Sequence, residues 1–284
     1  MTTEFGDSML RSADTAILKP GTESQGPDCI VCGGGTLKQF SKEYRTTEVG
    51  YFRCLSCGHL TASSFTTDGF YDNDQYTEQI DIGWAARNKR TLEFVMLLCR
   101  LPGIILSRNS RIGDCGCGPG AVVEALRKRG YIAFGYEPFP ARDQGSAFLF
   151  SDWSAFCEAA GQLDLVTCIE VLEHLRCPDE FLGNIARMLS PGGYLLVSTD
   201  IFNPRVHADD WYYINPTAGH VSIYSEKSLR LLMLKYGFLP ILRITGSLWL
   251  FRLAGQRRRM WFESGYYLVS QTRIKLGIRL RYQM

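Results

Sequence analysis

Two pairs of cysteines near the start of the chain have the spacing of a metal site. Cys29 and Cys32 form one Cys-x-x-Cys pair, and Cys54 and Cys57 form the second. A glycine follows each pair, so each is expected on a tight turn whose thiolates point at one spot, and two such turns supply the four-sulfur set that Zn²⁺ prefers. Four thiolates close the coordination shell and leave His59 outside it. We therefore predict a structural Zn²⁺ that folds its module and performs no catalysis; reduced turns without metal are the alternative.

A second candidate site is the stretch 111–120, which reads Arg-Ile-Gly-Asp-Cys-Gly-Cys-Gly-Pro-Gly. A strand is expected to enter this glycine turn and a helix over 121–129 to leave it. Glycines permit the tight turn and let a ligand lie against the backbone, while the helix N-terminus offers free N–H groups. The spacing differs from the Gly-x-Gly-x-x-Gly of dinucleotide-binding proteins. The residues expected to form the ligand platform are Asp114, Gly116, Gly118 and Gly120.

The elements that must position these groups alternate along the chain. Strands are expected over 111–115, 131–136, 148–150, 164–169 and 194–199, and helices over 84–101, 121–129, 178–189 and 225–236. A terminal hairpin is expected over 240–245 and 248–253. Such alternation predicts a parallel sheet with helices on both faces and ligands beyond the carboxyl ends of the strands. Glu137, Asp152 and Glu170 fall at such ends.

Several stretches in this order resemble the motifs of class I S-adenosylmethionine-dependent methyltransferases. They are the glycine turn, the acid Glu137 after the second strand, Asp152 after 148–150, the run 164–175 with its Glu-Val-Leu-Glu-His, and the Leu-Ser-Pro-Gly-Gly at 189–193. The resemblance implies an α/β, Rossmann-like sheet with helices on both faces and a terminal hairpin, preceded here by a small zinc ribbon. In this arrangement the chain is similar to bacterial small-molecule and sugar methyltransferases that carry an N-terminal cysteine module.

The resemblance also implies roles for the strand-end residues toward S-adenosylmethionine. The three glycines would admit its methionine part, with Asp114 fixing it through the loop or a water. Glu137 would hold the ribose, and Asp152 with Trp153 would hold the adenine. Glu170 is a further cofactor-binding candidate at the end of its strand. The alternative for these acids is that they cap strand ends.

The segment 200–224 is the candidate acceptor lid, because it is long and rich in His, Tyr, Trp and Asn. An insertion packed by its own aromatics is the alternative. His220 lies inside it and is the first candidate for the base that removes an acceptor proton. The alternative is that His220 bonds a backbone carbonyl. His174, in the turn after the strand 164–169, is the second catalytic candidate, although the family often keeps it for structure.

Bulk properties fit an ordinary globular protein, with 45% hydrophobic and 21% charged residues among 284. No apolar run approaches the roughly 18 residues of a membrane span, and no signal-peptide pattern is present, so a cytoplasmic location is expected. The expected organisation is a disordered N-terminus over 1–26, the zinc-ribbon module and linker over 27–80, a methyltransferase domain over 81–253, and a basic aromatic tail over 254–284. The oligomeric state has no sequence signal.

Three functions remain open at this stage. The first is methyl transfer to the oxygen, nitrogen or carbon of a small molecule, such as a sugar, a nucleotide-linked sugar or a secondary metabolite, with an acceptor that is phosphate-bearing or carrier-linked. The second is an RNA base methyltransferase, since residues 252–284 carry eight Lys or Arg and one acid. The third is an inactive, cofactor-binding regulatory protein. Anionic lipid or no partner at all are alternatives for the basic tail.

Overall fold

The computed structural model describes residues 25–63, 83–139 and 146–254. The expected disordered N-terminus, most of the linker after the ribbon and the basic tail lie outside these residues, so the RNA and lipid alternatives stay predictions. Within the described ranges, no helix combines the length and apolar character needed to cross a membrane.

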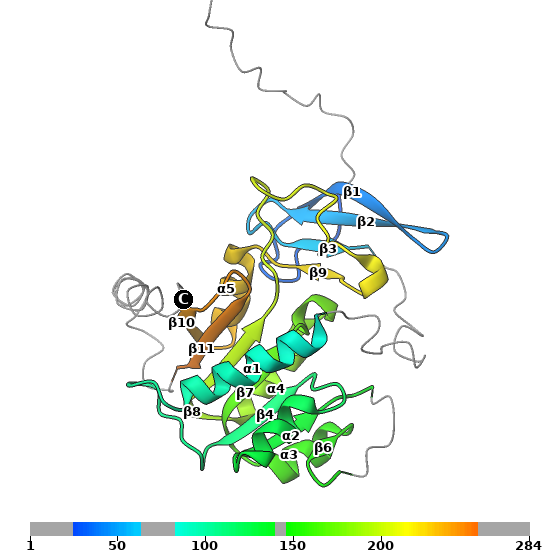
Figure 1. The fold of residues 1–284 in the computed structure, drawn as a ribbon. Coiled ribbons are helices and arrows are strands. Elements are labelled where there is room, and N and C mark those ends of the chain that lie inside the picture. Colours follow the sequence, from blue (N-terminus) through cyan, green and yellow to red (C-terminus); the bar gives the residue numbers. More distant parts are fainter. Residues whose placement is uncertain (1–24, 64–82, 140–145, 255–284) are drawn as a thin grey trace, which may run out of the picture.

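A seven-stranded sheet forms the centre of the larger part of the molecule (Figure 1). Its order is β10-β11-β8-β7-β4-β5-β6. The parallel strands are β4 (Arg111–Cys115), β5 (Ile132–Tyr136), β6 (Leu149–Phe150), β7 (Leu163–Ile169) and β8 (Leu189–Ser198). The antiparallel pair β10 (Phe238–Arg243) and β11 (Leu248–Leu253) completes the edge next to β8. The expected α/β sheet with a terminal hairpin is confirmed.

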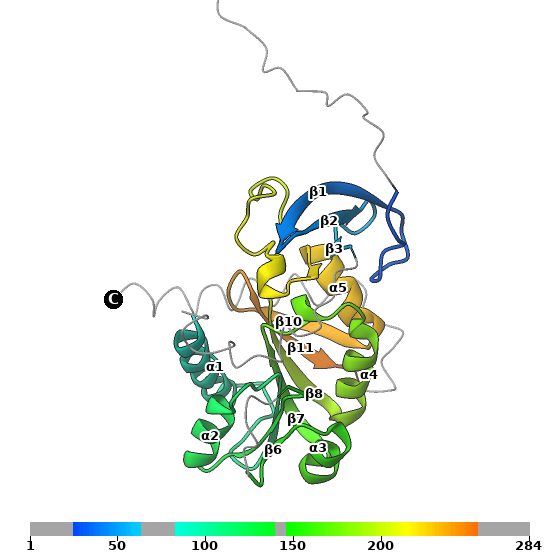
Figure 2. The same ribbon diagram turned by 90° about the vertical axis from the view of Figure 1, so that its right-hand side faces the viewer.

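Helices cover both faces of this sheet, as Figure 2 shows. On one face lie α1 (Trp84–Leu98) and α2 (Ala121–Lys128), whose Val95, Leu98, Val123 and Leu126 are buried in one core with the sheet. On the other face lie α3 (Trp153–Ala160), α4 (Pro178–Met188) and α5 (Glu226–Lys235). Burial of both faces of the sheet explains why apolar residues predominate in the parallel strands β5 and β7.

Two of the sequence-based boundaries were wrong in ways that have a physical reason, and one helix was missed. The first helix ends at Leu98, three residues before the expected Leu101. The strand expected at 194 begins at Leu189, because a register irregularity after the Leu163–Leu189 pair absorbs the Pro-Gly-Gly that suggested a turn. The helix α3 was missed altogether; it follows directly on Asp152, which the sequence suggested as a ligand and which caps this helix.

A second, four-stranded antiparallel sheet joins the N-terminal module to a distant part of the chain. Its order is β1 (Thr36–Tyr44), β2 (Thr47–Cys54), β3 (Leu60–Ala62) and β9 (Ser222–Ile223). Leu60 pairs with Ile223 and Thr61 with Ser222, so the end of the 200–224 segment is a strand of this ribbon sheet (Figure 1). The two parts share one core, which contains Val49, Tyr51, Leu60, Ala62, Phe202, Tyr213, Ile214, Val221 and Ile223. The 200–224 segment is therefore anchored on the ribbon.

Candidate functional site

The glycine turn after β4 has the backbone conformation that its composition predicts. Gly116, Gly118 and Gly120 all have positive φ, at 82°, 52° and 82°. A Cβ at Gly116 would lie 2.3 Å from Cγ2 of Val171, so no larger residue fits there. A Cβ at Gly118 would meet no described atom within 4 Å. The turn therefore packs against Val171 at Gly116, whereas there is space beside Gly118 in which a ligand could lie against the backbone.

Asp114 lies beneath this turn and is almost fully buried. Its Oδ1 accepts a hydrogen bond of 2.5 Å from the hydroxyl of Thr167 on the neighbouring strand β7. Burial raises the pKa of its carboxyl to about 6, against the lowering effect of the Thr167 hydrogen bond. Asp114 can therefore stabilise the glycine turn through its hydrogen bond with Thr167 and without contacting a ligand directly.

Glu137 follows β5 and reaches the glycine turn. Its Oε2 accepts from the backbone N–H of Gly118 and its Oε1 from that of Phe139, both at 3.1 Å. Burial raises the pKa of the carboxyl, and the two backbone hydrogen bonds lower it. The ends of β4 and β5 are thus tied together by the acid that the sequence assigned to the ribose.

Asp152 and Trp153 follow β6, the edge strand that pairs with β5. Oδ1 of Asp152 accepts from the backbone N–H of Ala155 at 2.8 Å and caps the helix α3, a role that neither the ligand assignment nor the strand-end alternative included. The indole of Trp153 meets the ring of Tyr136 edge-on, with centroids 4.7 Å apart. A contact of either residue with adenine stays a prediction.

Glu170, at the end of β7, begins a second polar group next to the glycine turn. It has a φ of 54°, which is uncommon for a residue with a side chain. Its Oε1 accepts from the Ser198 hydroxyl at 2.6 Å, and its Oε2 accepts from the Tyr213 hydroxyl at 3.2 Å. The Tyr213 oxygen also lies 3.2 Å from that of Thr199. Strand ends β7 and β8 are thereby linked to the 200–224 segment.

His220 and His174, the two catalytic candidates, lie together at this end of the sheet. Their ring centroids are 5.0 Å apart and meet edge-on. Nδ1 of His220 is 2.7 Å from the carbonyl of Tyr213 and donates to it, which leaves Nε2 as the basic nitrogen of the neutral ring. Burial lowers the pKa of His220 and lowers that of His174 to about 3. The alternative role of His220, a hydrogen bond to a backbone carbonyl, is therefore observed for Nδ1. Nε2 can still accept a proton.

Glu173 joins the two histidines and was missed by the sequence reasoning. Its side chain is completely buried, and neither carboxylate oxygen has a hydrogen-bond partner. Burial and the nearby Glu170 raise its pKa well above the usual range. The hydroxyls of Tyr213 and Thr199 lie close enough to favour the charged form without forming hydrogen bonds of normal geometry with it. The sequence feature that could have identified Glu173 is its position directly before His174, just after a buried strand.

His207, the other histidine of the 200–224 segment, stays apart from this group. Its ring stacks on Trp211 with centroids 4.0 Å apart, and its Nδ1 accepts from the backbone N–H of Asn203 at 3.2 Å.

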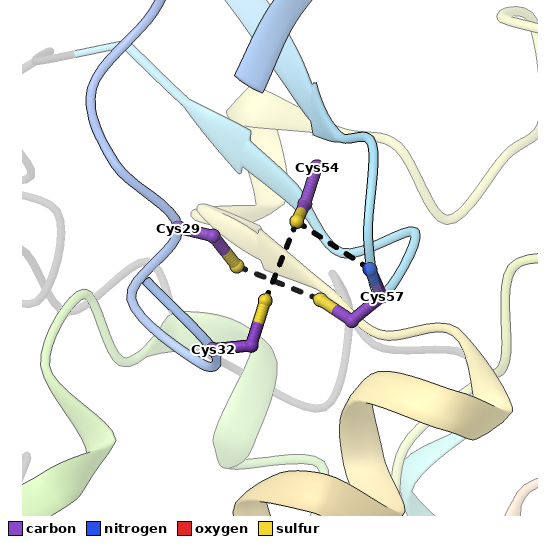
Figure 3. A group of neighbouring side chains, drawn as sticks. All are labelled: Cys29, Cys32, Cys54 and Cys57. Carbon is purple, nitrogen blue, oxygen red and sulfur yellow. Dashed lines mark hydrogen bonds between the residues drawn. The ribbon is translucent and has the colours of Figure 1, made fainter. Parts of the chain in front are cut away.

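The four ribbon cysteines converge as their spacing predicts (Figure 3). The sulfurs of Cys29 and Cys57 are 3.5 Å apart, as are those of Cys32 and Cys54. All four lie within 4.8 Å of one another, a donor set that suits tetrahedral Zn²⁺. Buried His59 is not part of this group and instead faces the ring of Tyr224, with centroids 4.9 Å apart.

Comparison with known proteins identifies the family of the chain. A family model described as "Methyltransferase domain" matches residues 86–241. The chain belongs to this methyltransferase family. The resemblance identified from the sequence motifs is therefore confirmed.

This methyltransferase resembles curated proteins over part of its length. A ubiquinone biosynthesis O-methyltransferase of Aeromonas salmonicida is 36% identical over 109 residues, which are 34% of this chain and 46% of that protein. A protein of the same name from Pseudomonas aeruginosa is 32% identical over 109 residues, or 34% and 47% of the two chains. The methyltransferase thus spans less than half the length of these relatives.

Solved structures of similar fold include an O-methyltransferase family protein from Burkholderia thailandensis. That protein has a TM-score of 0.47 and 18% identity, with 68% of this chain and 64% of that chain covered. A SAM-dependent methyltransferase from Methanosarcina mazei has a TM-score of 0.40 and 16% identity, with coverage of 55% and 99%.

Proposed function

We propose that this chain transfers a methyl group from S-adenosylmethionine to an oxygen of a small-molecule acceptor. The observation that carries the proposal is the placement of two different polar groups along one edge of the main sheet. Glu137 and the open Gly118 follow β5 and β4, and the Glu170–Tyr213–His220 group follows β7 and β8. A cofactor and an acceptor need such adjoining sites, because methyl transfer is an in-line displacement between two bound molecules.

Glu137 would hold the ribose hydroxyls, because a carboxylate accepts two hydrogen bonds from a vicinal diol. Gly116, Gly118 and Gly120 would accommodate the methionine part, and Asp152 and Trp153 the adenine. Asp114 would keep the loop in place through its bond to Thr167. S-adenosylmethionine supplies the activated methyl carbon.

His220 would remove the acceptor proton. Its Nδ1–H is committed to the Tyr213 carbonyl, so Nε2 is the nitrogen free to accept. A neutral imidazole is required for this task, and burial lowers the pKa of His220 and favours the neutral form. Tyr213, held between Glu170 and Thr199, would border the acceptor on the same side. An oxygen acceptor is favoured because the curated relatives are named as O-methyltransferases.

The four cysteines would hold a structural Zn²⁺. The site has no open position for a substrate, so its contribution is to fold the ribbon. The ribbon supports the acceptor side, since β3 pairs with β9 next to His220. The zinc module would then form one side of the acceptor-binding site.

The test combines cofactor binding with turnover. Calorimetry should show S-adenosylmethionine binding to the full chain. Incubation with a panel of phenols, catechols, sugars and nucleotide-linked sugars should release S-adenosylhomocysteine with one acceptor class, detected by chromatography. A chain that does not bind S-adenosylmethionine would overturn the proposal. Binding without turnover on any acceptor would favour the regulatory alternative.

A further inference from the structure

The side chain of Arg176 connects the main sheet to the N-terminal ribbon. Arg176 is half-buried and follows the 3₁₀ turn η1 (Leu172–His174) after β7. Its Nη1 donates to the carbonyl of Ala62 at 3.2 Å, and its Nη2 donates to the carbonyl of Ser63 at 3.0 Å. Ala62 is the last residue of β3, so the guanidinium holds the ribbon where its third strand ends. The proposed methyl transfer gives no role to this side chain.

The backbone of Ala62 is held on both sides. Its carbonyl accepts from Arg176, while its N–H donates to the carbonyl of Val221 at 2.9 Å. The N–H of Val221 donates in turn to the carbonyl of Glu173 at 2.8 Å, and Glu173 lies three residues before Arg176. These hydrogen bonds form a closed loop through the end of β3, the residue after His220 and the turn after β7. A change at Arg176 should therefore reach the backbone next to His220.

A second path leads from Arg176 to His220 through Tyr51. The Tyr51 hydroxyl donates a hydrogen bond to the backbone carbonyl of His220. Burial raises the pKa of the Tyr51 phenol, and the positive charge of Arg176 acts against this rise. The guanidinium thus lies near the phenol, and its charge makes the hydroxyl a better hydrogen-bond donor. Arg176 supports the main chain of His220 from both paths.

The contact with the ribbon suits a guanidinium and not an ammonium group. Two carbonyls on consecutive residues require two donors held at a fixed spacing, which the planar fork of Arg provides. Lys carries a single compact charge on a flexible stem, so it would retain the charge without the paired geometry. The contact therefore predicts a difference between Arg and Lys at position 176.

We propose that Arg176 is a positioning residue that holds His220 and the turn after β7 in the arrangement required for removal of the acceptor proton. This role rests on the proposed function, because His220 is the proposed base. Alignment supplies much of the rate in a transfer between two bound molecules, and a displacement of about 1 Å can cost on the order of 100-fold. Arg176 acts through Ala62, Val221 and Tyr51 and takes no part in the transfer itself.

The full chain with Arg176→Lys tests the proposal, and Arg111→Lys is the matched control. Arg111 is also half-buried, and it donates to two consecutive carbonyls, those of Ala160 at 2.7 Å and Ala159 at 2.9 Å. Arg111 begins β4, whereas the proposed sites follow the carboxyl ends of the strands. The two variants therefore lose equivalent pairs of contacts at different places in the fold.

Steady-state kinetics with the accepted substrate separate positioning from stability. We expect Arg176→Lys to lower kcat by about 10- to 100-fold while the KM for S-adenosylmethionine stays within about twofold. Arg111→Lys should leave both quantities within about twofold of the wild type. A purely structural role of Arg176 would not separate the two variants in this way.

Amide hydrogen exchange gives a second measurement that does not depend on turnover. In Arg176→Lys the N–H groups of Ala62 and Val221 should exchange at least about 10-fold faster than in the wild type, because one end of their hydrogen-bonded loop is released. The N–H groups of the central strand β7 should exchange as in the wild type. In Arg111→Lys the exchange at Ala62 and Val221 should not change.

Unchanged exchange at Ala62 and Val221 in Arg176→Lys, or a kcat equal to that of Arg111→Lys, overturns the proposal. If Arg176→Lys fails to fold by circular dichroism, Arg176→Gln takes its place in both measurements. Wild-type protein whose Ala62 and Val221 amides exchange as fast as those of an unfolded chain also overturns it. Wild-type protein that binds no S-adenosylmethionine, or turns over no acceptor, contradicts the proposed function instead. The exchange comparison then decides by itself whether Arg176 holds the backbone beside His220.

Discussion

The phenol of Tyr51 donates a hydrogen bond of 2.9 Å to the backbone carbonyl of His220, across 169 residues of sequence. Tyr51 is completely buried in the core that the ribbon shares with the 200–224 segment. One residue further on, the carbonyl of Val221 accepts from the N–H of Ala62. The ribbon therefore fixes the main chain of the residue proposed to act on the acceptor.

Tyr51→Phe should lower turnover while leaving S-adenosylmethionine affinity unchanged, because it removes the contact that holds His220. The lost hydrogen bond to a buried carbonyl should also lower the free energy of unfolding by about 1–2 kcal/mol. Tyr194→Phe is the matched control. The Tyr194 hydroxyl accepts a hydrogen bond from the backbone N–H of Ile105, and Tyr194 lies in the core between the main sheet and the helices α1 and α2. Equal losses of turnover in both variants would show a general stability effect. Kinetics and urea unfolding measure the two quantities.

His220→Ala should reduce kcat by roughly 10²–10⁴ while cofactor affinity stays within about twofold, because the loss affects only the acceptor side. The comparison variant is His207→Ala, whose ring stacks on Trp211 away from this group. Steady-state kinetics at neutral pH with the accepted substrate provide the measurement. Turnover within a few-fold of the wild type would remove His220 from the chemistry.

Glu137→Ala should weaken S-adenosylmethionine binding by at least about 1.5 kcal/mol, since two charge-assisted ribose hydrogen bonds are lost. The variant also frees the N–H of Gly118, which Glu137 now holds. Glu124→Ala on the exposed face of α2 removes a carboxylate of no expected role and serves as the control. Calorimetry on the three proteins decides, and unchanged affinity in Glu137→Ala would exclude this residue from the site.

Asp114 should give the cofactor-free protein a pH-dependent stability. Its native pKa of about 6 lies above the ordinary 3.8, so between these values the folded chain holds a proton that the unfolded chain has lost. The free energy of unfolding should therefore fall, by up to about 3 kcal/mol, as pH rises from about 4 to 6. Asp114→Asn should remove this part of the slope in urea unfolding, and exposed Asp209→Asn should not. Parallel wild-type and Asp114→Asn curves would contradict the assignment.

About one zinc per chain should copurify, and Cys54→Ser should give insoluble or protease-sensitive protein. The reason is that metal affinity is folding energy for a module of this size. Because the ribbon shares its core with the 200–224 segment, proteolysis should reach that segment as well as the ribbon. Exposed Cys177→Ser is the control. Metal-free wild-type protein with a normal melting transition would contradict the zinc ribbon.

The sequence predicts those parts of the molecule that depend on local patterns. The alternation of strands and helices, the turn at Gly116 and the convergence of Cys29 and Cys57 follow from spacing and backbone preference. The helix α3 was missed because Asp152 resembled a ligand more than a cap.

The remaining features depend on contacts between distant residues. The two-residue strand β9 carries no periodic signal, and its pairing with β3 exists only in the folded chain. The burial of Glu173 likewise comes from packing of the 200–224 segment against the end of β7, which no local pattern records.

The pairing of β3 with β9 determines when the ribbon sheet can be completed during synthesis of the chain. The four cysteines, for which we propose a zinc ion, leave the ribosome while most of the main sheet is still untranslated. The fourth strand of the ribbon sheet arrives only with Ser222 and Ile223, so Leu60 and Tyr51 lack their partners until then. During that interval the ribbon residues of the shared core would lack the side chains of the 200–224 segment, and completing this core requires a contact of high sequence separation. Slow translation through the parallel sheet would prolong this interval and make the ribbon a site for chaperone binding.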